Sequence, residues 1–257
     1  MQEKIITGKD IAEKLKDVEH KIVVTSGKGG VGKSTIAALL AVHYARQGKS
    51  VGIFDADFLG PSIPRLFGIE DKAQELTIGT KGINPVYTDK YGIKVLSIQF
   101  MLKSRESPVI WRGLAINTAI RSFLGSVEWG KLDYLIFDMP PGTGDAILTV
   151  MDFVELDGLI MVTIPQDLSA MIVEKAINMA RKMDTEVLGI VENMSYFECP
   201  KCGERIYLFG KDKAIELCRK YDIDLIAQIP FDRELLDYCD RGRIEDFPYD
   251  YFEYFYY

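Results

Sequence analysis

Residues 27–34 read GKGGVGKS and fit the pattern G-x-x-x-x-G-K-[ST], which is typical of a phosphate-binding loop. The stretch follows an apolar run and precedes a helical pattern, as such a loop requires. Its glycines let backbone N–H groups converge on phosphate oxygens, and the N-terminal end of the following helix adds positive potential. Lys33 is expected to reach the terminal phosphates, and the Ser34 hydroxyl to ligate Mg²⁺. The residues predicted to contact a nucleotide are Gly27, Lys28, Gly29, Gly30, Val31, Gly32, Lys33, Ser34 and Thr35.

Acidic side chains follow two other apolar runs. Asp55 and Asp57 end the stretch IFDAD, and Asp138 stands in YLIFDMPPGTGD, where Asp145 follows a glycine-rich turn. In an open α/β sheet, ligands bind at the carboxyl ends of the strands. Carboxylates at that edge can orient a water molecule and hold Mg²⁺ through its hydration shell. Taken alone, any one of these aspartates could instead cap a helix. The glycines of the PPGTG turn would let it respond to a γ-phosphate.

Cys199 and Cys202 form a Cys-x-x-Cys pair in the stretch FECPKCGE. The pair supplies two thiolates, whereas tetrahedral zinc or a [4Fe–4S] cluster needs four protein ligands. A two-fold dimer in which each subunit contributes two sulfurs would complete such a site. The spacing alone fits zinc almost as well as an iron–sulfur cluster, and a redox dithiol is a third alternative. The other two cysteines, Cys218 and Cys239, stand in amphipathic helical patterns and are expected to be core or surface thiols.

The composition is that of an ordinary globular chain, because 47% of its 257 residues are apolar and 27% are charged. The formal net charge of −7 disfavours a general affinity for nucleic acid or anionic lipid. No apolar run approaches the roughly 18 residues of a membrane-spanning helix, and the first residues lack the apolar core of a signal peptide. We therefore expect a cytoplasmic protein with no stable membrane association. His20 and His43 have no metal-ligand neighbour at useful spacing, which excludes a His-rich metal site.

The elements that must position these residues alternate between apolar strands and helical patterns. This alternation predicts a single α/β domain over residues 1–257, with a mostly parallel sheet and helices on both faces. The expected strands cover residues 20–27, 49–57, 94–101, 132–140, 158–165, 187–195 and 224–231. The expected helices cover residues 6–20, 33–48, 113–127, 145–155, 169–183 and 212–221.

The C-terminal stretch 246–257, DFPYDYFEYFYY, contains eight aromatic residues in twelve positions. It carries too few charges for a solvated tail, so we expect it to pack on its own domain or on a partner subunit. A membrane-surface anchor is disfavoured, because the polar residues of the stretch are acidic and anionic lipid would repel them.

The extra lysine in KGGVGKST, Lys28, resembles that of the deviant Walker A motif found in the MinD, ParA and nitrogenase-iron-protein class of ATPases. Within that class, the stretches FDADFLGPSIPRLFG, WRG and DMPPGTGD are similar to those of the Mrp/ApbC-type iron–sulfur cluster carrier ATPases. The resemblance extends from about residue 21 to residue 243. It implies a P-loop NTPase fold with ATP and Mg²⁺ as ligands.

The resemblance also implies roles for individual residues. Lys28 would cross a dimer interface and contact the phosphates held by the other subunit, as an arginine finger does; the alternative is a solvated loop charge. Asp57 would position the attacking water, and Asp138 would support Mg²⁺ as the Walker B residue. Asn193 and Pro230 would frame the adenine. The catalytic residues implied are Lys28, Lys33, Asp57 and Asp138.

These features together predict a slowly hydrolysing ATPase homodimer that binds a [4Fe–4S] cluster and transfers it to apoproteins. Zinc is the lesser possibility at the cysteine pair, and it would leave a zinc-clasped ATPase dimer. A positioning ATPase of the MinD/ParA kind is a second alternative, but it calls for a basic amphipathic C-terminal helix or a basic DNA-binding face. A small-molecule kinase on the same fold is a third alternative.

Overall fold

The computed structural model describes residues 6–58, 60–80, 82–101, 113–165, 170–210 and 213–257. Trp111 and Arg112 of the WRG stretch lie outside the described residues. The centre of the molecule is an eight-stranded sheet in the order β12–β9–β8–β1–β7–β2–β6–β5. The edge strand β5 pairs antiparallel with β6, and the other neighbours pair in parallel. The predicted mostly parallel sheet is therefore confirmed.

The strands of this sheet are β1 Val18–Ser26, β2 Val51–Asp55, β5 Val86–Tyr87, β6 Lys94–Ser97, β7 Leu132–Asp138, β8 Gly158–Thr163, β9 Val187–Glu192 and β12 Leu225–Gln228. Outside it, the described residues form the hairpins β3 Thr77–Ile78 with β4 Ile83–Asn84, and β10 Phe197–Glu198 with β11 Arg205–Ile206.

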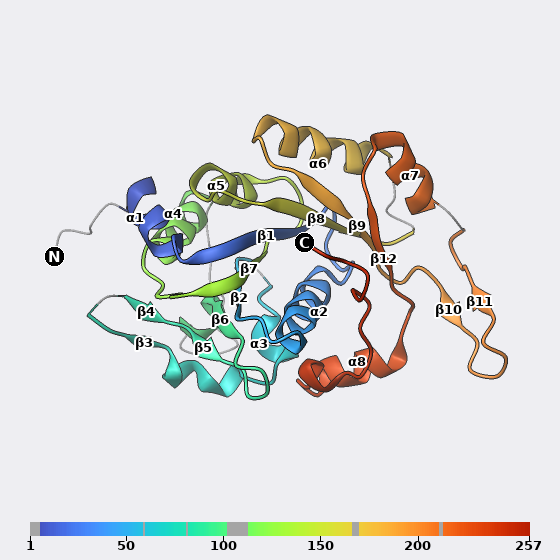
Figure 1. Cartoon of the computed structure of the whole chain (residues 1–257), viewed down its shortest axis with the longest axis horizontal. Coiled ribbons are helices and arrows are strands. Elements are labelled where there is room, and N and C mark those ends of the chain that lie inside the picture. The colour runs from blue at the N-terminus through green and yellow to red at the C-terminus, as the bar shows by residue number, and fades with distance from the viewer. Residues whose placement is uncertain (1–5, 59, 81, 102–112, 166–169, 211–212) are drawn as a thin grey trace.

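The helices cover both faces of the sheet, as predicted (Figure 1). One layer contains α1 Gly8–Leu15, α4 Gly113–Leu124, α5 Asp145–Phe153, α6 Ala170–Lys182 and α7 Lys213–Tyr221. The opposite layer contains α2 Lys33–Arg46, α3 Ile63–Leu66 and α8 Arg233–Asp240. Short 3₁₀ helices in the described residues are η1 Glu70–Glu75, η2 Ile98–Met101 and η3 Ile244–Asp246. Among the described helices, none combines the length and apolar character that crossing a bilayer requires.

Strand β1 shows why an unbroken apolar run forms the middle of this sheet. Ile22 and Val24 pack with the α2 layer, whereas Val23 packs with the opposite layer. All three are fully buried, because successive side chains of a strand point to opposite faces and both faces are covered. Each such burial stabilises the fold by roughly 1.5–3 kcal/mol. The strand thereby fixes the position of the phosphate loop that follows it.

Most element boundaries lie within about three residues of the sequence-based prediction, and two elements differ by more. The helix expected over 6–20 ends at Leu15, and residues from Val18 onward belong to β1, where Val18 pairs in register with Leu132. The strand expected over 94–101 ends at Ser97 and continues as η2. The Ser97 hydroxyl accepts a hydrogen bond from the Gln99 N–H at 3.3 Å, which turns the chain away from the sheet.

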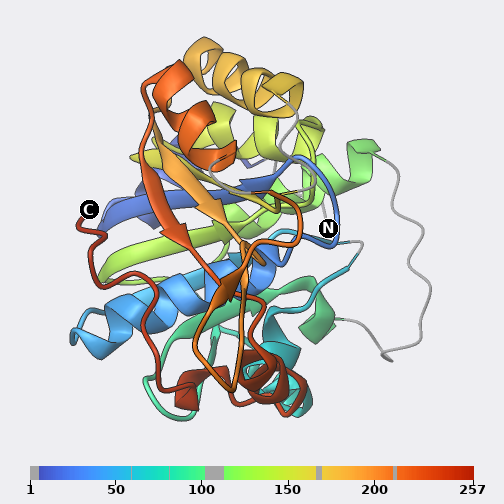
Figure 2. The same ribbon diagram turned by 90° about the vertical axis from the view of Figure 1, so that its right-hand side faces the viewer.

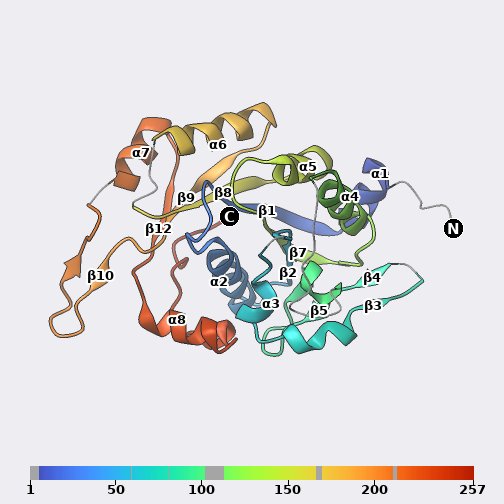
Figure 3. The ribbon, with the colours of Figure 1, turned by 180° about the vertical axis from the view of Figure 1, so that it is seen from behind.

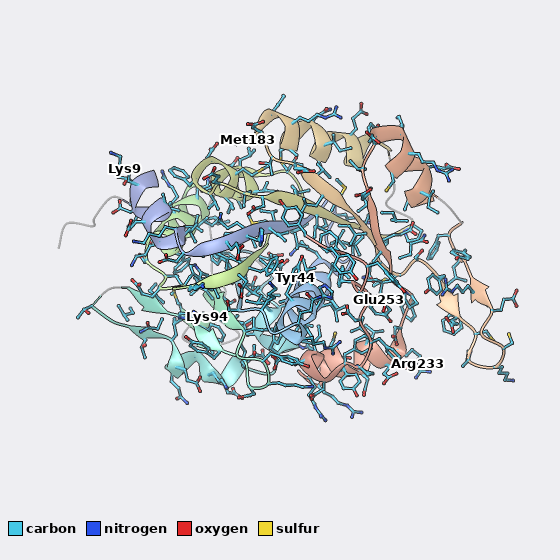
Figure 4. The ribbon with its side chains drawn as sticks, viewed as in Figure 1. Lys9, Tyr44, Lys94, Met183, Arg233 and Glu253 are labelled. Atoms are coloured by element: carbon cyan, nitrogen blue, oxygen red, sulfur yellow. The ribbon has the colours of Figure 1, made fainter. Side chains whose placement is uncertain are left out.

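The aromatic C-terminal stretch packs on its own chain, along helix α2. Phe247 and Phe252 are buried in the core on the α2 side of the sheet. Arg46 of α2 donates to the carbonyl groups of Phe247 and Tyr249, and His43 lies 2.8 Å from Asp250 Oδ2. Figure 2 shows the stretch passing the C-terminal end of α2 toward the amino ends of the central strands, at the end of the sheet opposite the phosphate loop, and Figure 4 labels Tyr44 of α2 in this region.

Candidate functional site

The phosphate loop links β1 to α2 and lies against a pocket of about 250 Å³. Gly30 and Gly32 have φ angles of 81° and 83°, a left-handed conformation that L side chains rarely adopt. Gly32 is the N-cap residue of α2, and no side chain caps the helix there. The first N–H groups of α2 are thus available to phosphate oxygens. The pocket is lined by Ser26, Lys28, Gly29, Gly30, Gly32, Lys33, Ser34, Thr35, Asp57, Gly60, Ser62 and Pro141.

Two of the residues predicted within the loop, 27–35, do not line this pocket. Val31 is buried in the hydrophobic core, so it contributes its backbone and its packing rather than a pocket surface. Gly27 lines a neighbouring cavity of about 180 Å³ together with Thr25 and Thr143. The other seven predicted residues surround the main pocket.

Lys33 and the predicted catalytic aspartates come together at the carboxyl ends of β2 and β7. Lys33 Nζ lies 2.5 Å from Asp138 Oδ1 and 3.8 Å from Asp57 Oδ2. It also lies 3.3 Å from the Ser34 hydroxyl. Lys33 and Asp138 are buried, and Asp57 is half-buried. The ammonium therefore neutralises part of a strongly acidic site at the mouth of the phosphate loop.

Asp55 adds a third carboxylate beneath this site. It is completely buried and accepts hydrogen bonds from the Ser97 hydroxyl at 3.0 Å and from the Asp57 N–H at 3.3 Å. Burial raises the pKa of Asp55 well above its usual range, and the nearby Asp138 carboxylate raises it further. Burial also raises the pKa of Asp138, while the Lys33 ammonium acts in the opposite direction. The sequence predicts that Asp55 lies with Asp57 at the end of a strand, but it does not predict a separate role for Asp55. Its position as the last residue of a buried strand is the signal that could have indicated a buried carboxylate at the site.

The donor set fits a divalent cation that shares its coordination with nucleotide phosphates and water. The second carboxylate oxygen of Asp138 is buried and has no hydrogen-bond partner among the residues that the structure describes. Such an oxygen is costly to bury unless a cation or donor satisfies it. Within the described ranges, no three His, Cys, Asp or Glu side chains are grouped so that they could hold a metal ion by themselves. Mg²⁺ commonly keeps several waters and takes few protein ligands, so Ser34 and Asp138 match its needs.

The PPGTG turn contacts the phosphate loop directly. The Gly142 N–H donates to the Ser26 carbonyl at 2.6 Å, and Gly142 has a φ angle of 94°. A Cβ atom added to Gly29 would lie 3.8 Å from the Pro141 ring, and Pro141 lines the same pocket as the loop glycines, so the two loops lie side by side.

Lys28 is exposed at the rim of the pocket. Its own carbonyl accepts a hydrogen bond from the Ser26 hydroxyl at 3.0 Å, which holds the backbone of the loop at this point. The side chain thus starts from a fixed position beside the phosphate-binding groups.

Asn193 lies next to the phosphate loop, and Pro230 lies on a neighbouring loop. Asn193 is buried at the end of β9 and donates through Nδ2 to the Val31 carbonyl at 2.9 Å. Pro230 follows Ile229, whose N–H donates to the Glu192 carbonyl at 2.9 Å. Neither side chain lines the 250 Å³ pocket, so their expected contacts with adenine stay a prediction.

The cysteine pair lies at the end of the β10–β11 hairpin, which projects beyond β12 (Figures 1 and 3). The Cys199 N–H donates to the Glu204 carbonyl at 2.9 Å, and the Gly203 N–H donates to the Cys199 carbonyl at 2.8 Å. Gly203 closes this turn with a φ angle of 72°. Cys199 is half-buried and Cys202 is exposed. The backbone N–H groups of Lys201 and Cys202 lower the pKa of the Cys199 thiol, which favours the thiolate that metals bind.

The other two cysteines differ in all these respects. Cys218 and Cys239 are buried in α7 and α8, which confirms their predicted placement in helices. Burial raises the pKa of each thiol to about 11. They are therefore poor candidates for metal ligands or nucleophiles.

Comparison with known proteins identifies relatives over nearly the whole chain. The family described as NUBPL iron-transfer P-loop NTPase, of the ParA type, matches residues 17–249. An iron–sulfur cluster carrier protein from Saccharolobus solfataricus is 47% identical over 230 residues, which cover 89% of this chain and 77% of that protein.

Solved structures agree with this relationship. A nucleotide-binding protein from Archaeoglobus fulgidus, solved in complex with ADP, is 56% identical and has a TM-score of 0.89 over 98% of each chain. The cell division protein MinD from Aquifex aeolicus has a TM-score of 0.57 at 24% identity over 87% of each chain, a likeness that concerns the fold alone. The predicted P-loop NTPase fold is confirmed.

Proposed function

The chain belongs to the NUBPL iron-transfer P-loop NTPases, and from this premise we propose that it is an ATP-hydrolysing homodimer that binds a [4Fe–4S] cluster and transfers it to apoproteins. One observation carries the proposal. Two accessible thiols, one with a lowered pKa, stand on a projecting hairpin, and no third ligand is grouped with them among the described residues. A second copy of the chain would supply the other two thiolates that a cluster needs.

The cargo assignment draws on the relatives. The similar protein of S. solfataricus is named an iron–sulfur cluster carrier protein. Sulfur donors alone suit zinc as well, so the choice of iron–sulfur over zinc rests on this relationship. A carrier must release its cargo, and a site split between two chains can open when the chains move apart.

In the proposed ATPase reaction, each charged or hydroxyl side chain at the nucleotide site has one task. Lys33 neutralises the terminal phosphates, Ser34 and Asp138 hold Mg²⁺, and Asp57 orients the attacking water. Lys28 extends from the rim to the phosphates of the partner subunit, where it stabilises the charge of the transition state. Asn193 and Pro230 frame the adenine. Bound Mg²⁺ supplies additional neutralisation of the transferring phosphoryl group.

Turnover tests the nucleotide half. Asp57→Asn should leave ATP binding largely intact but slow hydrolysis by at least about tenfold, taking water positioning at the low end of such effects. An unchanged hydrolysis rate would mean that Asp57 has a structural role only.

A positioning ATPase of the MinD kind is less well supported. Residues 246–257 form an aromatic, acidic stretch that packs on α2, and they do not form a basic amphipathic helix. A thiol hairpin would also have no task in that function. We further propose a cytoplasmic location and no nucleic-acid partner, in line with the net charge of −7.

Cluster transfer tests the carrier function directly. The chain is reconstituted anaerobically with iron and sulfide, separated from excess reagents and mixed with the apo form of an enzyme that needs a [4Fe–4S] cluster. We expect the acceptor to gain activity faster than it does with the same amounts of free iron and sulfide. A reconstituted chain that holds zinc but no iron, or that never activates an acceptor, would contradict the carrier function.

A further inference from the structure

Asn193 belongs to the nucleotide site by its contact and to the cysteine hairpin by its position in the chain. It stands six residues before Cys199. Its side chain is 6% exposed and donates to the Val31 carbonyl of the phosphate loop. Besides framing the adenine as proposed above, the side chain thus joins the phosphate loop to the segment that leads to the cysteine hairpin.

Asn193 is held closely by the phosphate loop on one side and by the end of β8 on the other. A Cβ atom on Gly32 would lie 2.3 Å from Asn193 Nδ2, so the loop approaches the amide only because this residue is glycine. The Asn193 N–H donates to the Thr163 carbonyl at 2.8 Å, which ties its backbone to the end of β8. The amide therefore has little room to move unless the phosphate loop moves with it.

From Asn193, a series of contacts leads to the hairpin. The Ser195 N–H donates to the Ile229 carbonyl at 2.8 Å, and the Ser195 hydroxyl donates to the buried Glu192 carboxylate at 2.5 Å. Gln228 donates to the same carboxylate at 2.7 Å. These bonds hold the segment after Asn193 against β12, so it can transmit a displacement instead of absorbing it.

Tyr196 carries the series into both strands of the hairpin. Its carbonyl accepts from the Phe231 N–H at 2.7 Å. Its ring lies 5.7 Å from the Tyr207 ring, and the Arg205 guanidinium lies 4.6 Å above it. Tyr196 immediately precedes β10, while Arg205 begins β11. The base of the hairpin is thus fixed to the segment that Asn193 anchors on the phosphate loop.

We propose that Asn193 is a positioning residue that couples the nucleotide state of the phosphate loop to the reactivity and metal affinity of Cys199 and Cys202. Nucleotide binding shifts the backbone at Val31 and Gly32, Asn193 follows, and the segment 194–198 changes the setting of the hairpin. Coupling between two ligand sites is reciprocal, so a metal on the thiols must alter nucleotide affinity by the same factor. If the chain carries a cluster as proposed above, this link lets ATP control how firmly the cluster is bound.

The metal-free chain tests the link through its thiols. The rate at which Cys199 and Cys202 react with N-ethylmaleimide is measured by peptide mass spectrometry, with and without saturating ADP. In the wild type, we expect ADP to change this rate by about fivefold, the low end of typical coupling between sites. A wild-type rate that ADP leaves unchanged, with ADP binding verified by calorimetry, would overturn the proposal.

Variants at position 193 locate the link. Asn193→Ala removes the donor to the Val31 carbonyl, and Asn193→Asp keeps the size of the side chain but cannot donate there. In either variant with ADP bound, the effect of ADP on the thiols should fall to less than about twofold, below the range of significant coupling. Asn84→Ala is the matched control, because it removes one side-chain bond to Thr77 in the β3–β4 hairpin. A fivefold effect that survives in both Asn193 variants would also overturn the proposal.

A second measurement tests the link without any change at position 193. Zn²⁺ is bound to the reduced thiols, and the dissociation constant of ADP is measured with and without it. We expect a change of about fivefold in the wild type, and none in the Cys199→Ser/Cys202→Ser variant, because hydroxyl groups are poor ligands for zinc. Equal ADP affinities in the wild type would contradict the link. Neither measurement uses iron, sulfide or an acceptor, so its outcome is independent of whether cluster transfer occurs.

Discussion

Lys33 Nζ lies 2.5 Å from Asp138 Oδ1, with both side chains buried at the mouth of the phosphate loop. A buried pair of this kind is costly to break by removing one partner, because the other charge is left uncompensated. Asp55 and Asp57 lie close by, so Lys33 is the cation that allows anionic phosphates to approach three carboxylates.

Lys33→Ala should therefore abolish ATP binding. The variant loses the charge that contacts the terminal phosphates, and it leaves Asp138 and Asp57 to repel them. Calorimetric titration with Mg²⁺-ATP measures the affinity. Lys16→Ala, at an exposed lysine of the α1 end, is the control and should bind normally. An ATP affinity unchanged by Lys33→Ala would refute the assignment of the phosphate loop.

Lys28 should act on the nucleotide of the partner subunit. Lys28→Ala is expected to bind ATP nearly normally but to hydrolyse it poorly. When this variant is mixed with Lys33→Ala, the intact phosphate loop of the Lys28→Ala chain receives a working Lys28 from its partner. Partial recovery of ATPase activity in the mixed dimers is the expected result. No recovery, with heterodimers demonstrated by native mass spectrometry, would mean that Lys28 does not act across an interface.

The alkylation rates of the thiols should depend on pH in clearly different ways. The pKa of Cys199 is lowered by backbone N–H groups, so its thiolate fraction and its alkylation rate rise at a lower pH than for an ordinary thiol. Cys218 and Cys239, with pKa values of about 11, should stay unreactive up to about pH 9 in the folded chain. Alkylation with iodoacetamide, followed residue by residue by mass spectrometry, measures the profiles. Faster reaction of Cys218 or Cys239 than of Cys199 at pH 7 would contradict the account of the hairpin.

The C-terminal stretch should contribute to stability through its buried rings. Phe252→Ala removes a side chain that is 1% exposed, and it should lower the free energy of unfolding by about 3–5 kcal/mol. Tyr254→Ala is the control, because Tyr254 is 83% exposed and its loss should cost less than about 0.5 kcal/mol. Urea unfolding followed by circular dichroism measures both. Equal stabilities of the two variants would show that the stretch is not part of the core.

The features that local sequence determines were predictable. The phosphate loop is fixed by glycine spacing between a strand and a helix, and β1 by an apolar run covered on both faces. The ends of elements were harder to predict, because they depend on partners distant in the chain. Val18 joins β1 through its pairing with β7, although the preceding residues have helical spacing.

The tertiary contacts of the site could not be predicted either. Nothing in the stretch VENMS indicates that Asn193 bonds the Val31 carbonyl, since the two residues meet only after β9 is placed beside β8. The same holds for the C-terminal stretch, where composition predicts burial but not the docking of Asp250 on His43. The role proposed for Lys28 involves a second chain, so the loop sequence predicts the residue but not the interface that it would cross.

Cluster content per chain tests the central claim most directly. After anaerobic reconstitution, iron and sulfide are measured for the wild type, for Cys199→Ser/Cys202→Ser and for the control Cys218→Ser/Cys239→Ser. We expect the wild type and the control to reach about one [4Fe–4S] cluster per two chains, and the hairpin variant to hold none while still binding ATP. A full cluster in the hairpin variant, or one cluster per chain in the wild type, would contradict a cluster shared between two Cys199–Cys202 pairs.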